Sequence, residues 1–127
     1  MLVKYAVVYI SMMTKKKTRK RSAKTERAIA LGEWSKKVRE RDGWKCAMCG
    51  RTECRLQAHH ILPKKYWPEH MYDIRNGICL CPRCHTFCKT SAHQSGIYFA
   101  IWLSKNRSEQ YADILKLIQL SLGGDAL

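Results

Sequence analysis

Acidic side chains are scarce in this chain of 127 residues: 10 are Asp or Glu and 24 are Lys or Arg, for a formal net charge of +14. Such an excess predicts a polyanionic partner, most simply nucleic acid, although charge alone does not separate DNA from RNA or a membrane surface. There is no internal repeat, and the paired glycines Gly123 and Gly124 lack the pattern of a phosphate-binding loop. The length allows one compact domain and little more.

A long apolar run is also missing, because the apolar stretch at residues 1–13 is too short to cross a bilayer. Its single lysine and apolar run resemble a weak signal peptide, but no small-residue cleavage site follows. We favour the interpretation in which the start is Met12 or Met13 rather than Met1, and an ordinary edge strand is the alternative. We expect no membrane partner.

Positive charge is concentrated in residues 15–24. Blocks of like charge stay solvated and often act as arms on nucleic acid, whereas the plainer interpretation is a solubilising tail. Both interpretations remain open, and either makes residues 1–24 a flexible basic arm. The candidate nucleic-acid contacts are Lys15, Lys16, Lys17, Arg19, Lys20, Arg21, Lys64 and Lys65.

The chain has seven cysteines, an odd number that excludes complete internal pairing. Four of them form two C-x-x-C pairs, Cys46/Cys49 and Cys81/Cys84, which indicates metal binding rather than disulfides in a basic chain of intracellular type. Zn²⁺ takes four such ligands at about 2.3 Å in a tetrahedron. The pairs therefore predict a structural zinc with no open position for substrate, and buried thiols are the less favoured alternative.

The segment between and after the pairs predicts a strand, a loop, a second strand and a helix. The first strand is "LQAHHIL", which ends before a proline and carries His59 and His60 side by side. The second, "RNGICLC", begins with the turn dipeptide Asn76-Gly77 and includes Cys79. The helix is "PRCHTFCKTSA", with its proline at the first position and His85 and Lys89 four residues apart on one face.

Helices are predicted on both flanks. Residues 23–43 place Leu31, Trp34 and Val38 at helical spacing, and Gly43 suits the position after the helix end. Residues 96–122 predict two helices separated near Asn106-Arg107. Their expected buried residues are Ile97, Ile101, Ile114, Leu117 and Ile118. We prefer a cap packed on the preceding module, and a dimer contact is the alternative.

The stretches "AHHILP" and "RNGICLCPRCH", flanked by the two C-x-x-C pairs, resemble the HNH nuclease family over about residues 34–93. The resemblance implies an α+β fold, a small ββα-metal module with zinc knuckles, an N-terminal helix and a C-terminal helical cap. The expected division is an arm at 1–24, the nuclease module at 25–95 and a helical extension at 96–127.

The resemblance also implies roles for individual residues. His60 matches the general base that deprotonates water, and His59 matches a ligand of the catalytic ion that is often Asp in the family. His85 matches a second metal ligand. Asn76 matches an asparagine that either binds metal or fixes the loop that orients the base, and Lys89 lies where a cation would help near the scissile phosphate. Adjacent histidines at a distorted strand end would point in the different directions that metal and base require.

The implied function is a metal-dependent DNA endonuclease with a structural Zn²⁺ and a catalytic divalent ion such as Mg²⁺ or Mn²⁺. The expected partners are duplex DNA, with a homodimer or a larger phage or mobile-element complex, in the cytoplasm of a bacterial or phage-infected cell. The alternatives are a zinc-stabilised nucleic-acid-binding module without catalysis and a nuclease directed at RNA. His70 and His93 are expected to be ordinary polar residues, although His93, eight residues after His85, could approach the same helix face again.

Overall fold

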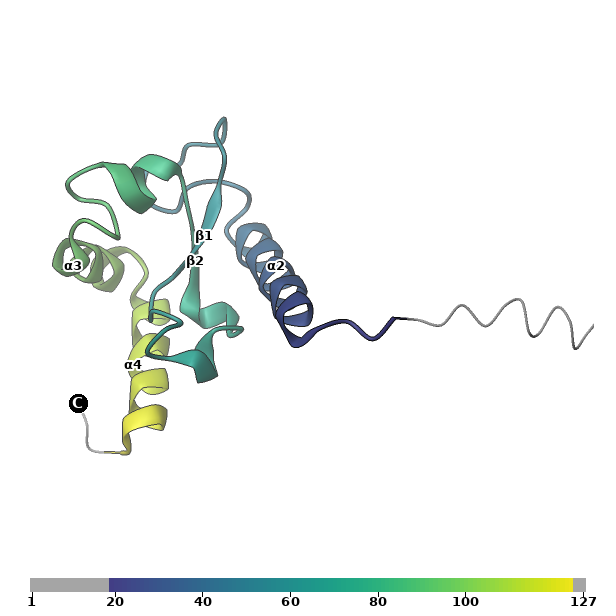
Figure 1. Ribbon diagram of the computed structural model, residues 1–127. Coiled ribbons are helices and arrows are strands. Elements are labelled where there is room, and N and C mark those ends of the chain that lie inside the picture. The colour runs from purple at the N-terminus through teal and green to yellow at the C-terminus, as the bar shows by residue number, and fades with distance from the viewer. Residues whose placement is uncertain (1–18, 125–127) are drawn as a thin grey trace, which may run out of the picture.

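A computed structural model of the protein describes residues 19–124. Two short antiparallel strands lie between α2 (Ala23–Arg41) on one side and the helices α3 (Gly96–Asn106) and α4 (Ser108–Leu122) on the other (Figure 1). The predicted α+β class, with helices on both flanks of a small ββα module, is confirmed. The apolar segment at residues 1–13 and Lys15, Lys16 and Lys17 of the predicted arm lie outside the described residues.

Helix α2 has clear signals at both ends. The Ser22 hydroxyl caps its first turn by accepting a hydrogen bond from the Thr25 N–H at 3.2 Å. Beyond the C-cap, Gly43 adopts a φ of +70°, the left-handed conformation that glycine tolerates best. The helix buries Trp34 and Val38 against the sheet, as predicted from their spacing.

The strands are β1 (Gln57–His60) and β2 (Gly77–Leu80), and their register pairs His59 with Ile78 and His60 with Gly77. All four residues of β2, Cys79 among them, are buried. The predicted turn at Asn76-Gly77 is wrong, because Gly77 has extended backbone inside the ladder. Glycine is needed there for space, since a Cβ would lie 2.4 Å from Val38 Cγ2.

The predicted helix at residues 82–92 is also wrong beyond its first turn. A π-helical turn spans Arg83–Phe87, and Cys88 is extended with φ −83° and ψ 158°. The Cys88 N–H bonds to the Arg83 carbonyl at 3.0 Å, so it does not continue an α-helical ladder. The chain instead folds back, and the N–H groups of residues 92 and 93 bond to the carbonyls of residues 84 and 85.

The two C-terminal helices separate at Arg107, as predicted, but the expected buried face of α3 is wrong. Ile97 is 78% exposed and Ile101 is 51% exposed, whereas Phe99 and Leu103 are buried. A shift of two positions turns a helix by about 200°, so these pairs lie on opposite faces. On α4, the predicted Ile114 and Leu117 are buried.

The main core includes three of the four paired cysteines, whereas Cys49 is exposed. Cys46, Cys81 and Cys84 are buried together with Ile78 and Leu80 of β2 and with Phe99 and Leu103 of α3. A smaller cluster joins Leu62 to Ile114 and Leu117 of α4. Among the helices of residues 19–124, none has the length and apolarity needed to cross a membrane.

Candidate active site and metal centre

The four paired cysteines converge on one point. The Sγ atoms of Cys46, Cys49, Cys81 and Cys84 all lie within 4.8 Å of one another, and those of Cys49 and Cys81 are 3.6 Å apart. Four thiolates at about 2.3 Å from a tetrahedral ion would be about 3.8 Å apart, so the donor set and its spacing fit Zn²⁺. The cluster can therefore hold a structural zinc.

Local backbone geometry shapes both cysteine turns. After the first pair, Gly50 has a φ of +74°, and its N–H bonds to the Cys46 carbonyl at 2.8 Å. In the second pair, the Cys84 N–H points at Cys81 Sγ at 3.5 Å. Burial opposes ionisation of Cys81, but this N–H and the neighbouring thiols outweigh it and lower its pKa to about 7.

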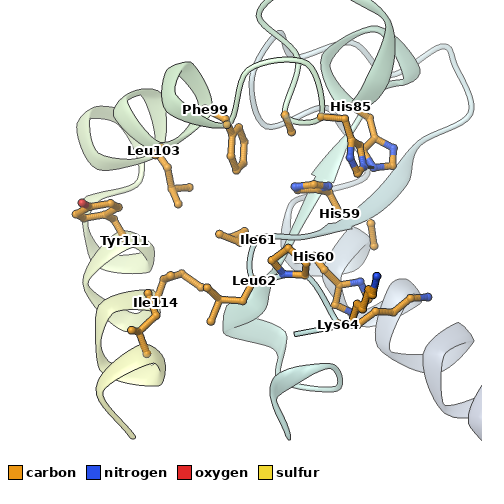
Figure 2. Close-up of a pocket in the computed structure, with 18 of the residues that line it drawn as sticks. His59, His60, Ile61, Leu62, Lys64, His85, Phe99, Leu103, Tyr111 and Ile114 are labelled. Atoms are coloured by element: carbon orange, nitrogen blue, oxygen red, sulfur yellow. Dashed lines mark hydrogen bonds between the residues drawn. The ribbon is translucent and has the colours of Figure 1, made fainter. Parts of the chain in front are cut away.

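A second cluster consists of His59, His85 and His93, whose ligand atoms also lie within 4.8 Å of one another. His59 comes from β1, His85 from the π-helical turn and His93 from the loop that folds back after it. The Nε2 atoms of His85 and His93 are 3.0 Å apart. Figure 2 shows His59 and His85 directed toward each other at one end of a cavity.

The protonation of this cluster suits metal binding. His85 Nδ1 lies 2.6 Å from Gln57 Oε1, an acceptor, so Nδ1 carries the proton and Nε2 keeps its lone pair. Burial, followed by the charges that His85 and His93 would carry, lowers the pKa of His59 to about 3. The buried His59 is therefore neutral at neutral pH, which is the form that binds metal.

His60 lies on the other face of β1. Its ring stacks on Trp34 of α2 with centroids 3.9 Å apart and an interplanar angle of 10°. Its Nε2 lies 2.9 Å from the Met71 carbonyl oxygen, so Nε2 donates and the lone pair is on Nδ1. Burial lowers the pKa of His60, the Met71 carbonyl opposes this, and the charge of Lys64 lowers it further.

The expected distortion of β1 at these histidines is wrong. The ladder is regular through His60, and the Ile61 N–H continues it by bonding to the Asn76 carbonyl at 3.0 Å. The pleat therefore separates the two rings, with His59 toward His85 and His60 toward Trp34.

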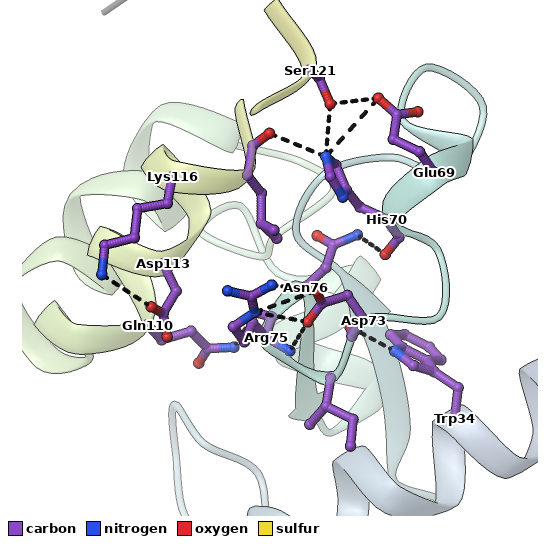
Figure 3. A network of polar contacts seen from close by, with 12 residues as sticks. Trp34, Glu69, His70, Asp73, Arg75, Asn76, Gln110, Asp113, Lys116 and Ser121 are labelled. Carbon is purple, nitrogen blue, oxygen red and sulfur yellow. Dashed lines mark hydrogen bonds and ion pairs between the residues drawn. The ribbon is translucent and has the colours of Figure 1, made fainter. Parts of the chain in front are cut away.

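Asn76 is completely buried, and its side chain is engaged with backbone (Figure 3). Oδ1 accepts from the Leu62 N–H at 2.6 Å, and Nδ2 donates to the Leu62 and His70 carbonyls at 3.1 Å each. Of the two roles predicted for Asn76, this geometry supports fixing the loop rather than binding metal. His70 is itself buried and contacts α4, with Nε2 2.7 Å from Ser121 Oγ.

A cavity of about 730 Å³ adjoins the histidines. Its wall runs along residues 58–65 and across to α3 and α4, where Phe99, Leu103 and Ile114 contribute (Figure 2). Lys64 and Lys65 line it near His60 and are exposed. The positive charge nearest the stacked histidine therefore comes from the loop that follows β1.

Comparison with known proteins identifies the central segment. A model of the HNH endonuclease family matches residues 46–87. This segment is therefore similar to the HNH endonuclease family. Among curated proteins, the chain is similar to Anaredoxin from Nostoc sp. (strain PCC 7120 / SAG 25.82 / UTEX 2576), with 33% identity over 51 residues. That match covers 40% of this chain and 64% of the relative, so the chain spans less than two thirds of the relative's length. No solved structure matches the chain significantly.

The HNH segment contains both cysteine pairs and His59, His60, Asn76 and His85, but α2 and His93 lie outside it. His93 was expected to be an ordinary polar residue, and the structure places it in the histidine cluster instead. The contact does not follow helical spacing, because His93 reaches His85 through the fold-back after Phe87. The sole signal in the sequence is the separation of eight residues from His85.

The role predicted for Lys89 has no helix to support it. The helix that would have placed Lys89 on one face with His85 ends at Phe87. Its placement beside a scissile phosphate stays a prediction. Lys64 is the lysine whose charge acts on His60. Arg19, Lys20 and Arg21 are exposed and precede α2, and the structure does not bring them to the histidines.

Proposed function

We propose that this protein is a metal-dependent DNA endonuclease that hydrolyses phosphodiester bonds, with His60 as the general base. The observation that carries the proposal is the fixed tautomer of His60, which follows His59 of the histidine cluster in a segment that matches the HNH family. The Met71 carbonyl holds the proton on Nε2, which leaves Nδ1 free to accept a proton from water. Attack by that water oxygen on phosphorus forms one P–O bond and breaks the bond to the leaving sugar oxygen.

The histidine cluster is the proposed site of the catalytic ion. A divalent ion there would act as a Lewis acid on the phosphate and on the leaving oxygen. The residues that would hold it are His59 and His85, as expected from the family resemblance, with His93 as a third ligand. Because all three donors are imidazole nitrogens, the set suits Mn²⁺ or a later transition metal better than Mg²⁺, which prefers oxygen ligands.

Basic residues supply the proposed DNA interface. Lys64 and Lys65 are exposed at the cavity beside His60, where they would contact phosphates that flank the cleaved bond. The arm at residues 1–24 would add contacts that depend on salt but not on sequence. In this proposal, residues 25–95 form the nuclease module and residues 96–127 an extension that walls the cavity.

The test is cleavage of supercoiled plasmid with and without Mn²⁺ or Mg²⁺. His60→Ala should lower the cleavage rate by about 10²–10⁴, the usual contribution of a positioned general base, while zinc content and DNA binding are kept. His85→Ala should instead weaken the catalytic ion, so excess Mn²⁺ should restore part of its rate and none of the rate of His60→Ala.

If His60→Ala cleaves DNA at the wild-type rate, His60 is not the general base. A wild-type protein that binds DNA but cuts neither duplex nor single strands with any divalent ion would be a zinc-stabilised binding module instead. The same assay with RNA substrates distinguishes a DNA nuclease from a nuclease directed at RNA.

A further inference from the structure

We propose that Trp34 is a positioning residue for His60, which holds the imidazole plane and the loop that accepts its hydrogen bond. The inference rests on the proposed role of His60 as a base. Trp34 belongs to α2, which lies outside the segment that matches the HNH family. The helix before the HNH-matching segment would thus complete the catalytic arrangement.

The stack restrains the histidine ring directly. Trp34 is 5% exposed, and its ring lies 3.9 Å from that of His60 and within 10° of parallel. Rotation of the imidazole about its Cβ–Cγ bond would drive an edge into the indole. The stack and the hydrogen bond from Nε2 to the Met71 carbonyl together fix the direction in which the Nδ1 lone pair points.

The same indole also holds the loop that supplies the acceptor. Trp34 Nε1 donates to the Asp73 carbonyl at 2.9 Å, two residues beyond Met71 (Figure 3). The loop therefore has one fixed point on α2 and another on Asn76, whose amide bonds to the His70 carbonyl. One side chain thus orients both the ring and its hydrogen-bond partner.

The absence of a side chain at Gly77 leaves the space in which the Trp34 indole reaches His60. In the ladder, Gly77 lies directly opposite His60. A Cβ at this position would come 2.7 Å from Trp34 Cζ2 as well as 2.4 Å from Val38 Cγ2. Since the backbone of Gly77 is extended and allows any residue, the absent Cβ serves the close approach of α2.

The experiment compares Trp34→Leu, which removes the stack and the N–H, with Trp34→Phe, which keeps an aromatic face. Val38→Ala is the matched control, because Val38 is fully buried on the same helix and packs at Gly77, whereas the stacking and hydrogen-bond partners of His60 are Trp34 and Met71. Cleavage is measured at saturating Mn²⁺ to separate kcat from KM. Histidine-labelled protein is studied by NMR without added divalent ion, and the ring-current shift of the His60 protons is recorded.

We expect the His60 protons to be shifted upfield in the wild type and in Trp34→Phe, and the shift to be lost in Trp34→Leu. The kcat of Trp34→Leu should fall about 10–100-fold, as for a reacting group displaced by about 1 Å, with KM within about threefold of wild type. Trp34→Phe should retain most of the rate. Val38→Ala should lose stability but keep both the kcat and the shift.

Three results would overturn the proposal: no upfield shift in the wild type, a wild-type kcat in folded Trp34→Leu, or an equal loss of kcat in Val38→Ala. If Trp34→Leu does not fold, the ring-current shift of the His60 protons in the wild type and the kcat of Trp34→Phe still test the proposal. If wild-type protein cuts no substrate, the proposed function fails, and the NMR shifts separately show whether the indole holds the ring.

Discussion

At the scale of single residues, Asp42 connects three elements. Its Oδ2 accepts from the Cys79 N–H of β2 at 2.8 Å, and its Oδ1 accepts from Arg107, ahead of α4, at 2.9 Å and from Arg41 of α2 at 3.0 Å. Burial opposes ionisation, but the hydrogen bonds from Arg41, Cys79 and Arg107 outweigh it and hold the pKa of Asp42 below its usual range. The carboxylate is therefore ionised at neutral pH where the three elements meet.

Asp42→Asn should lower the free energy of unfolding by about 2–4 kcal/mol, because two arginines lose a charged partner at a side chain that is 3% exposed. Urea denaturation at pH 7 and fixed zinc concentration measures the loss. The control is Asp113→Asn, whose partner Lys116 is 3.8 Å away and 68% exposed, and there we expect less than about 0.5 kcal/mol. Equal losses in both variants would contradict the role given to Asp42.

At the scale of elements, sequence patterns located most of the fold. The convergence of the two C-x-x-C pairs, the strand around His59 and the end signal at Gly43 each depend on neighbours in sequence, and each was confirmed. The errors arise where tertiary contacts decide. The helix predicted at residues 82–92 is replaced by a short turn and a fold-back. The buried face of α3 is the one that packs on the cysteine-rich core, and it does not include the isoleucines.

The face of α3 can be tested with two aliphatic truncations on the same helix. Leu103→Ala should lower the free energy of unfolding by about 2–5 kcal/mol, because Leu103 is 1% exposed in the main core. Ile97→Ala should change it by less than about 0.5 kcal/mol, because Ile97 is 78% exposed. Thermal or urea unfolding gives both values, and the reverse order would support the face predicted from sequence.

For the candidate site too, the sequence predicted some of the contacts and missed others. The family resemblance implied that His59 and His85 would share a site, and the structure brings their ligand atoms into one cluster. Only a separation of eight residues from His85 pointed to His93, and nothing local indicated that the Met71 carbonyl would set the tautomer of His60 or that Trp34 would stack on it. Each of these contacts spans a loop or joins separate elements, so it exists only in the folded chain.

At the scale of the whole molecule, the cysteine cluster is part of the core, with Cys46, Cys81 and Cys84 buried and Cys49 exposed. The first knuckle is tied to β2 by the bond from the Ala47 N–H to the Cys79 carbonyl at 2.9 Å, and the second leads directly into His85. A chain of this size has a small core, so a metal bound there contributes folding free energy.

We therefore expect purified protein to hold about one tightly bound Zn²⁺ per chain through Cys46, Cys49, Cys81 and Cys84. Cys49→Ser should lose the zinc and unfold or aggregate, whereas Cys88→Ser, a cysteine outside the cluster, should keep both zinc and fold. Elemental analysis after dialysis against a weak chelator, with circular dichroism, measures this. Well-folded wild-type protein without zinc would defeat the expectation.

The regular pairing of β1 with β2 has a consequence for how two identical side chains acquire different tasks. His59 and His60 are chemically the same, and only the parity of their positions along the strand sends one toward the other histidines and the next toward Trp34. A slip of one residue in the pairing would exchange their surroundings. Inserting one residue between Gln57 and His59 would therefore be more damaging than many substitutions, because it keeps both imidazoles in the chain but turns each to the opposite face of the sheet.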